Sequence, residues 1–161
     1  MEYEKTLPFA GDSETALKAA RSVLMQTGFE VTPLEDGSFQ ARHSGSVNTR
    51  QNPLKGATTV VVAARGDSLA LGAELGGVRK LRNFLIVFIG GMALLFLVGF
   101  GIFFLPKVRA GEMSPFMLLV PVAPFFPWPV GIPLLVHFYR SRVKNALATL
   151  LENARTVGKV G

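Results

Sequence analysis

Residues 84–105 read FLIVFIGGMALLFLVGFGIFFL, a run of 22 residues that carries no charge. A second apolar run covers residues 116–139, with its only titratable side chains at the far end. An α-helix rises about 1.5 Å per residue and the hydrocarbon core of a bilayer is about 30 Å thick, so each run is long enough to cross. Both runs are apolar on every helical face, which is not typical of a soluble core helix. The sequence therefore predicts a transmembrane hairpin over residues 79–139, with spans at 84–105 and 116–139 and an outer loop at 106–115.

The positive charge of the chain gathers beside the two runs. The net charge is +6 at pH 7, yet residues 1–78 carry seven basic and nine acidic side chains. Basic residues instead flank the runs: Arg79, Lys80, Arg82, Arg140, Arg142 and Lys144. Because positive residues near the ends of a span stay in the cytoplasm, both termini are predicted to be cytoplasmic and the membrane to be a bacterial inner membrane. The same cations suit a lipid bilayer with anionic headgroups, and their distribution argues against nucleic acid as a partner.

The first 78 residues have the pattern of a small α+β domain. Alternating or β-prone segments predict strands at 3–9, 29–33, 39–43, 58–64 and 68–75. A helix is predicted from Asp12 or Ser13, as N-cap, to Thr27, with Gly28 as its stop signal. We therefore expect an antiparallel sheet with one packed helix over residues 1–78, and a Gly76–Gly77 hinge leading into the membrane. The second face of this sheet is polar in the middle strands, where it carries Glu30, Thr32, Gln40 and Arg42.

The tail, residues 140–161, is predicted to be a basic amphipathic helix. Its apolar stripe is formed by Val143, Leu147, Leu150 and Ala154. Two placements are open: the helix docks on the sheet as a missing layer, or it lies in the headgroup plane with its basic residues at the phosphates. We favour docking. The order of strand, helix, strands and helix resembles helix-grip and TATA-binding-like folds, with the hairpin inserted before the last helix.

Catalytic and metal-binding patterns are not found in the sequence. There is no cysteine, which excludes disulfides and thiolate chemistry, and no catalytic triad, HExxH or P-loop pattern is found. His137 is the one weak cofactor candidate, because a membrane histidine can ligate haem iron or the magnesium of a chlorophyll. The first span offers no second histidine, so we interpret His137 as an interfacial residue beside Tyr139 and Arg140. We expect no enzyme activity, no cofactor and no metal.

The second apolar run contains a series of prolines, which removes backbone hydrogen bonds from its outer half. Each interior proline kinks a helix, and lipid cannot replace the lost bond. This half is therefore predicted to be kinked or partly non-helical and shielded by protein; the alternative is a broken helix that lines a transport site. Glycines on the first run leave notches for close helix packing. The candidate contact residues are Gly90, Gly91, Gly99, Gly101, Pro121, Pro124, Pro127, Trp128 and Pro129.

These observations favour a non-catalytic role. We expect an integral-membrane accessory or scaffolding subunit that packs beside a larger membrane protein complex, of which respiratory and photosynthetic complexes are examples. The alternative is a membrane protein that binds a lipid or small hydrophobe in a cavity between sheet and helices. A weaker third hypothesis is a membrane enzyme that uses Arg42, His43 and Arg50.

Overall fold

The computed structural model describes residues 2–34, 36–45 and 52–160. The fold is α+β, with one five-stranded antiparallel sheet and three α-helices. The chain divides into two compact units, which we call the sheet unit (residues 1–80 and 137–161) and the hairpin unit (residues 81–136). The sheet unit thus combines both ends of the chain.

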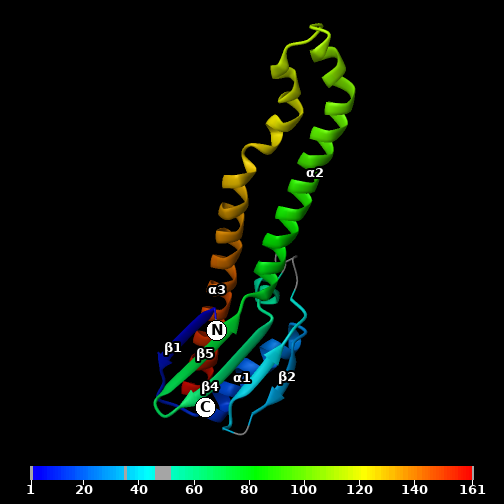
Figure 1. The fold of residues 1–161 in the computed structure, drawn as a ribbon. Helices are drawn as coiled ribbons and strands as arrows, with labels where there is room; N and C mark the ends of the chain where they lie inside the picture. The colour runs from blue at the N-terminus through cyan, green and yellow to red at the C-terminus, as the bar shows by residue number, and fades with distance from the viewer. Residues whose placement is uncertain (1, 35, 46–51, 161) are drawn as a thin grey trace. The chain divides into compact units, whose positions relative to one another are not determined.

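The sheet runs in the order β1-β5-β4-β3-β2, and every neighbouring pair is antiparallel (Figure 1). Its strands are β1 (Tyr3–Pro8), β2 (Glu30–Pro33), β3 (Phe39–Arg42), β4 (Thr59–Arg65) and β5 (Ser68–Glu74). A short 3₁₀ helix, η1 (Pro53–Gly56), precedes β4. β2 to β5 form a meander, whereas the first strand joins the last, with Tyr3 opposite Ala73. The sheet is therefore completed by strands that lie far apart in the sequence.

Helix α1 (Ser13–Gln26) begins after Asp12, one of the two predicted N-cap residues, and ends just before the predicted stop signal Gly28. Asp12 is the N-cap, and its carboxylate accepts hydrogen bonds from the Thr15 hydroxyl and, at 3.0 Å, from the Glu14 backbone N–H. These two bonds, the Thr15 bond first, hold the pKa of Asp12 below its ordinary value because they favour the charged form. Gly28 follows the helix with φ +89°, a left-handed conformation that glycine adopts without a Cβ clash.

One face of the sheet carries the core. Val60, Val62, Leu69 and Leu71 are at most 2 % exposed, and their registers place them on a single face. α1 packs there through Ala16, Ala20 and Leu24, spaced four apart on one stripe, and it contacts β2, β3 and β4. A helix about 10 Å wide covers only part of a five-stranded sheet, so the β1–β5 side needs a second cover.

The tail helix supplies that cover. α3 (Trp128–Val160) belongs to the sheet unit from residue 137 onward. Its side chains Val143, Leu147, Leu150, Leu151 and Ala154 are at most 4 % exposed. The Lys144 ammonium lies 5.7 Å from the centre of the Tyr3 ring on β1, and the Asp12 N–H donates to the Gly158 carbonyl at 2.8 Å. The helix therefore packs on protein along its apolar stripe, beside α1 (Figure 1).

From the sequence, the tail is expected to form a separate layer on the second face of the sheet. In the structure it covers the core face instead. Tyr3 is paired with Ala73, a fully buried residue of the core face, so α3 shares that face with α1. The second face stays open, with Glu30, Thr32 and Arg42 exposed and Gln40 half-buried. The physical reason is that an apolar helix stripe gains free energy only against apolar side chains, and the second face offers few.

Helix α2 (Gly76–Arg109) leads into the hairpin unit and is 34 residues long. The predicted hinge is wrong: Gly76 and Gly77 form the first helical turn and are buried. A Cβ on Gly76 would lie 2.5 Å from Thr58 Cγ2, so the absent side chain allows a close contact with the residue that precedes β4. α2 also continues through Pro106 to Arg109, which shortens the outer loop predicted at residues 106–115.

The return arm of the hairpin is not an α-helix throughout. Residues Pro115–Leu118 (η2) and Val120–Phe125 (η3) are 3₁₀ helices, and the α-helix begins only at Trp128. The partly non-helical outer half that the proline series predicts is therefore present in the structure. By length and composition, Gly76–Arg109 and the stretch Val120–Val160 are both apolar enough to cross a membrane.

Candidate functional site

The hairpin unit exposes many large apolar side chains. Within the most apolar 18-residue stretch of α2, no residue is buried. Bulky side chains are more than half exposed along both arms, among them Val87, Leu94, Leu95, Ile102, Phe103, Val120, Val130 and Leu134. Soluble proteins rarely expose a contiguous apolar patch of more than a few hundred Å², so this surface is suited to lipid or to other apolar helices.

The glycines of α2 that lie in the hairpin unit are open notches. A Cβ built at Gly90, Gly91, Gly99 or Gly101 would meet no heavy atom within 4 Å beyond its own helical turn. The return arm of the same hairpin therefore does not fill these positions. Beside Gly99, a shallow apolar depression of about 400 Å³ is lined by Met92, Leu95, Phe96, Gly99, Phe100 and Phe103. The notches offer close approach to a helix from outside this chain.

The proline-rich segment is mostly exposed as well. Pro121 is buried, and the Phe125 ring packs 5.8 Å from the Phe96 ring of α2. Pro124, Pro127 and Pro129 are exposed, and Trp128 is half-buried next to Gly131. The chain alone therefore covers only part of its irregular backbone.

The predicted basic residues are held in different ways. Arg79 pairs with Glu2 at 3.7 Å, and the Lys80 ammonium donates to the Ser44 carbonyl. Arg82 donates to the Asn83 side chain at 3.3 Å. Arg142 and Lys144 each lie 5.7 Å from an aromatic ring centre, those of Phe138 and Tyr3, and Arg140 is exposed. Arg142 and Lys144 are half-buried, whereas the other four cations are exposed and accessible to anionic groups.

The histidines occupy unlike places. His43 Nδ1 accepts a hydrogen bond from the Gly45 N–H at 3.0 Å, and its ring lies 5.2 Å from that of Phe29. The structure brings Arg42 and His43 together in a small cavity of about 370 Å³, completed by Gly28, Glu30 and Ser44. Arg50 lies outside the described residues. His137 is exposed, and among residues 2–34, 36–45 and 52–160 no three metal-ligating side chains of the His, Cys, Asp and Glu types gather.

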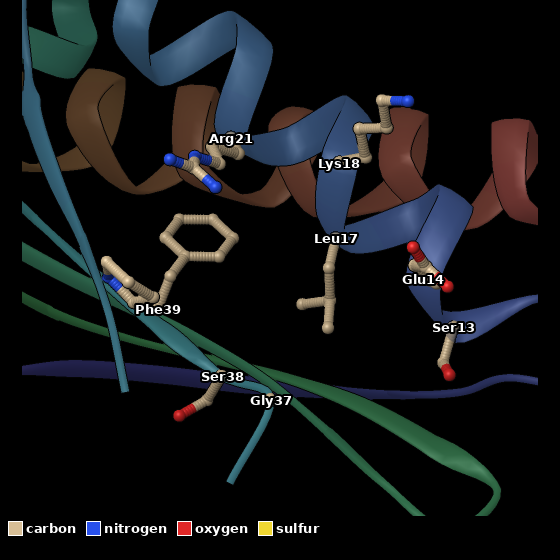
Figure 2. A pocket seen from close by; sticks show the side chains of 9 residues that line it. Ser13, Glu14, Leu17, Lys18, Arg21, Gly37, Ser38 and Phe39 are labelled. Carbon is tan, nitrogen blue, oxygen red and sulfur yellow. The ribbon is translucent and has the colours of Figure 1, made fainter. Parts of the chain in front are cut away.

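A larger cavity, of about 480 Å³, lies between α1 and the β2–β3 hairpin (Figure 2). Phe39, only 4 % exposed, forms its floor, and Leu17 points into it from the helix. Arg21 and Phe39 lie toward one end of the cavity, while Ser13 and Glu14 lie toward the opposite end. Pro33, Gly37, Ser38 and Lys18 complete the lining. This size is within the range of small-molecule sites, about 300–1,000 Å³.

The cavity follows from the spacing of residues on α1. The stripe at positions 16, 20 and 24 packs onto the sheet, and the adjacent stripe at 14, 17, 18 and 21 hangs over the hairpin. The turn between the strands is closed by the Leu34 N–H bonded to the Ser38 carbonyl at 2.9 Å, with Gly37 at φ +71°. Sequence reasoning identified none of these lining residues as a site, because the cavity exists only where helix and hairpin meet.

The fold and these surfaces define an α+β protein that carries two apolar helices long enough to cross a membrane. A scan against protein-family models, a search of curated proteins and a search of solved structures each found no match.

Proposed function

We propose that the chain is a non-catalytic integral-membrane accessory or scaffolding subunit that packs beside a larger membrane protein complex, such as a respiratory or photosynthetic one. The hairpin crosses the inner membrane twice, and both termini are cytoplasmic. The sheet unit supports this topology because it contains both ends of the chain. Residues 1–80 and 137–161 form one compact body, so they must lie on the same side of the membrane. The basic residues at the hairpin ends contact anionic headgroups on that side.

The exposed proline segment is the observation that carries the proposal. From Trp128 to Tyr139, the α-helix of the return arm spans only about 18 Å, against about 33 Å for residues 84–105. The rest of a roughly 30 Å crossing must use η2 and η3, whose prolines donate no backbone hydrogen bond. Irregular backbone at membrane depth is tolerated only when protein or a water-filled cavity covers it. Because exposed side chains of this segment such as Val120 and Phe126 are apolar, we infer that the cover is a protein neighbour rather than water.

The partner is tested by gentle extraction followed by native mass spectrometry. The wild-type chain, 17.4 kDa, is expected in a larger assembly. Replacing Gly90 and Gly101 by Leu fills two open notches and is expected to release at least about tenfold more free chain, because each bulky side chain blocks close helix contact. Replacing Val98 and Ile102 by Leu on the same helix is the matched control and should retain the assembly. A wild-type chain that runs alone in every mild detergent contradicts the proposal.

The topology is tested with single cysteines, which report without background because the chain has none. A cysteine in place of Glu112, in the connection between the arms, is expected to react with a membrane-impermeant maleimide on intact cells. Cysteines in place of Thr6 and Lys159, both exposed in the sheet unit, should react only after permeabilisation. Equal labelling of all three positions on intact cells contradicts the double crossing.

A second candidate function is the binding of a lipid or small hydrophobe. The cavity under α1 favours it, because its floor and one wall are apolar and its size suits a small ligand. Binding of this kind is compatible with a place beside a larger complex, since the cavity belongs to the sheet unit and the partner surface to the hairpin unit.

A further inference from the structure

We propose that the cavity between α1 and the β2–β3 hairpin selects a small amphipathic anion, a carboxylate or phosphate group on a compact apolar body. This inference rests on the second candidate function and names the chemistry of its ligand. The two ends of the cavity differ in charge, and that difference gives the ligand a direction.

The apolar body of the ligand is expected to contact the floor of the cavity and the side chain that projects from α1. Phe39 is buried beneath the cavity, whereas Leu17 is half-buried and projects into it (Figure 2). Pro33 adds a rigid apolar wall that donates no hydrogen bond. A flat or compact hydrocarbon that covers these side chains removes apolar surface from water, at about 25 cal/mol for each Å².

The anionic group is placed by Arg21. Arg21 is exposed at the Phe39 end of the cavity, and it forms no ion pair with any residue in the described part of the chain. An arginine offers a planar pair of N–H donors that matches carboxylate and phosphate oxygens. Lys18 adds a second positive charge at the rim but points away from the strands. An anion at the Arg21 end therefore gains both charge and hydrogen bonds.

The opposite end disfavours an anion. Glu14 stands there with Ser13, one helical turn before Lys18 and nearly two before Arg21. Its carboxylate repels a negative group placed near it and leaves the Arg21 end as the preferred position. Because the two ends carry opposite charges, changing one charge at a time must move the affinity for an anion in opposite directions.

The test uses the full-length chain in nanodiscs of a neutral phosphatidylcholine, with 1-naphthoate as the probe and 1-naphthalenemethanol as its uncharged counterpart. Equilibrium dialysis gives binding after subtraction of empty discs. We expect naphthoate to bind at least about tenfold more tightly than the alcohol, since a hydrogen-bonded charge is worth about that factor. Arg21→Gln should abolish this preference, and Glu14→Gln should raise the affinity for naphthoate a few-fold.

Two further variants fix the location. Leu17→Trp fills the cavity from a half-buried position and is expected to abolish binding of both probes. Arg65→Gln removes a similar charge from the exposed end of β4, outside the cavity, and should bind both probes as the wild type does. If naphthoate and the alcohol bind equally well and Leu17→Trp abolishes both, the selection for an anion is overturned. The second candidate function, binding of a small hydrophobe in this cavity, then stands. Binding of neither probe above empty discs overturns both, and binding that Leu17→Trp leaves intact overturns the cavity as the site.

Discussion

Replacing both Leu147 and Leu150 by Asp is expected to unfold the sheet unit. These side chains are 0 % and 4 % exposed on the face of α3 that packs against the core. Each change loses the burial of a leucine, about 2 kcal/mol, and places a carboxylate where it has no solvent. Together they should cost at least about 5 kcal/mol, which is comparable with the whole stability of a typical domain. Hydrogen exchange measured on peptides from β4 and β5 should become fast.

The matched control changes charge on the same helix without touching the core. Asn145→Asp with Asn153→Asp introduces two carboxylates at exposed positions, and it should leave exchange in β4 and β5 unchanged. Exchange within residues 84–105 is an internal reference, because it belongs to the hairpin unit. If the leucine variant exchanges like the wild type, the tail is not part of the folded core and the headgroup-plane placement is correct instead.

Replacing Gly158 by Leu is expected to lower the stability of the sheet unit by about 2–3 kcal/mol, or roughly 10–15 °C in its melting midpoint. A Cβ at this position would lie 2.8 Å from Ala16 Cβ, from the Asp12 carbonyl oxygen and from Phe9 Cζ. No flexible side-chain end can move aside for all three contacts, so the end of α3 must lift from α1. Lifting it also breaks the 2.8 Å hydrogen bond from the Asp12 N–H to the Gly158 carbonyl.

The effect should grow with the size of the new side chain, so Gly158→Ala should fall between the wild type and the leucine variant. Lys159→Leu is the matched control: it adds the same side chain at the next, exposed position and should melt within about 2 °C of the wild type. Melting is followed by the temperature dependence of protease cleavage in the sheet unit. A Gly158→Leu chain that melts like the wild type contradicts the close contact of the two helices.

The packing of the tail links the folding of the sheet unit to the path of the hairpin. Residues 1–80 contain the sheet and α1 but lack the side chains of α3 that help bury the core. The core therefore closes only after the chain has passed through the whole apolar hairpin and returned. A chain whose hairpin fails to return leaves apolar surface of the sheet exposed, so under the topology that we propose a failed second crossing would also lower the stability of the sheet unit.

Local signals in the sequence predicted most element boundaries. The turn residues and alternation gave five strands, each ending within about one to two residues of the structure, because β-prone runs and their breakers act over short distances. Asp12 and Gly28 mark the ends of α1 for reasons that depend only on neighbouring backbone groups. The two apolar runs follow from composition alone. In each case the deciding interaction lies within a few residues.

The sequence by itself determined the five strands, α1, the two apolar runs and the stripe of the tail helix, since each depends on the identity and spacing of neighbouring side chains. Only the tertiary structure decided what that stripe meets, because a row of Val143, Leu147, Leu150 and Ala154 is equally suited to protein and to lipid. It also decided that the tail shares the face of α1, and that a cavity opens between Leu17 and Phe39. Those outcomes depend on how segments distant in the chain fill the same space, which no local pattern encodes.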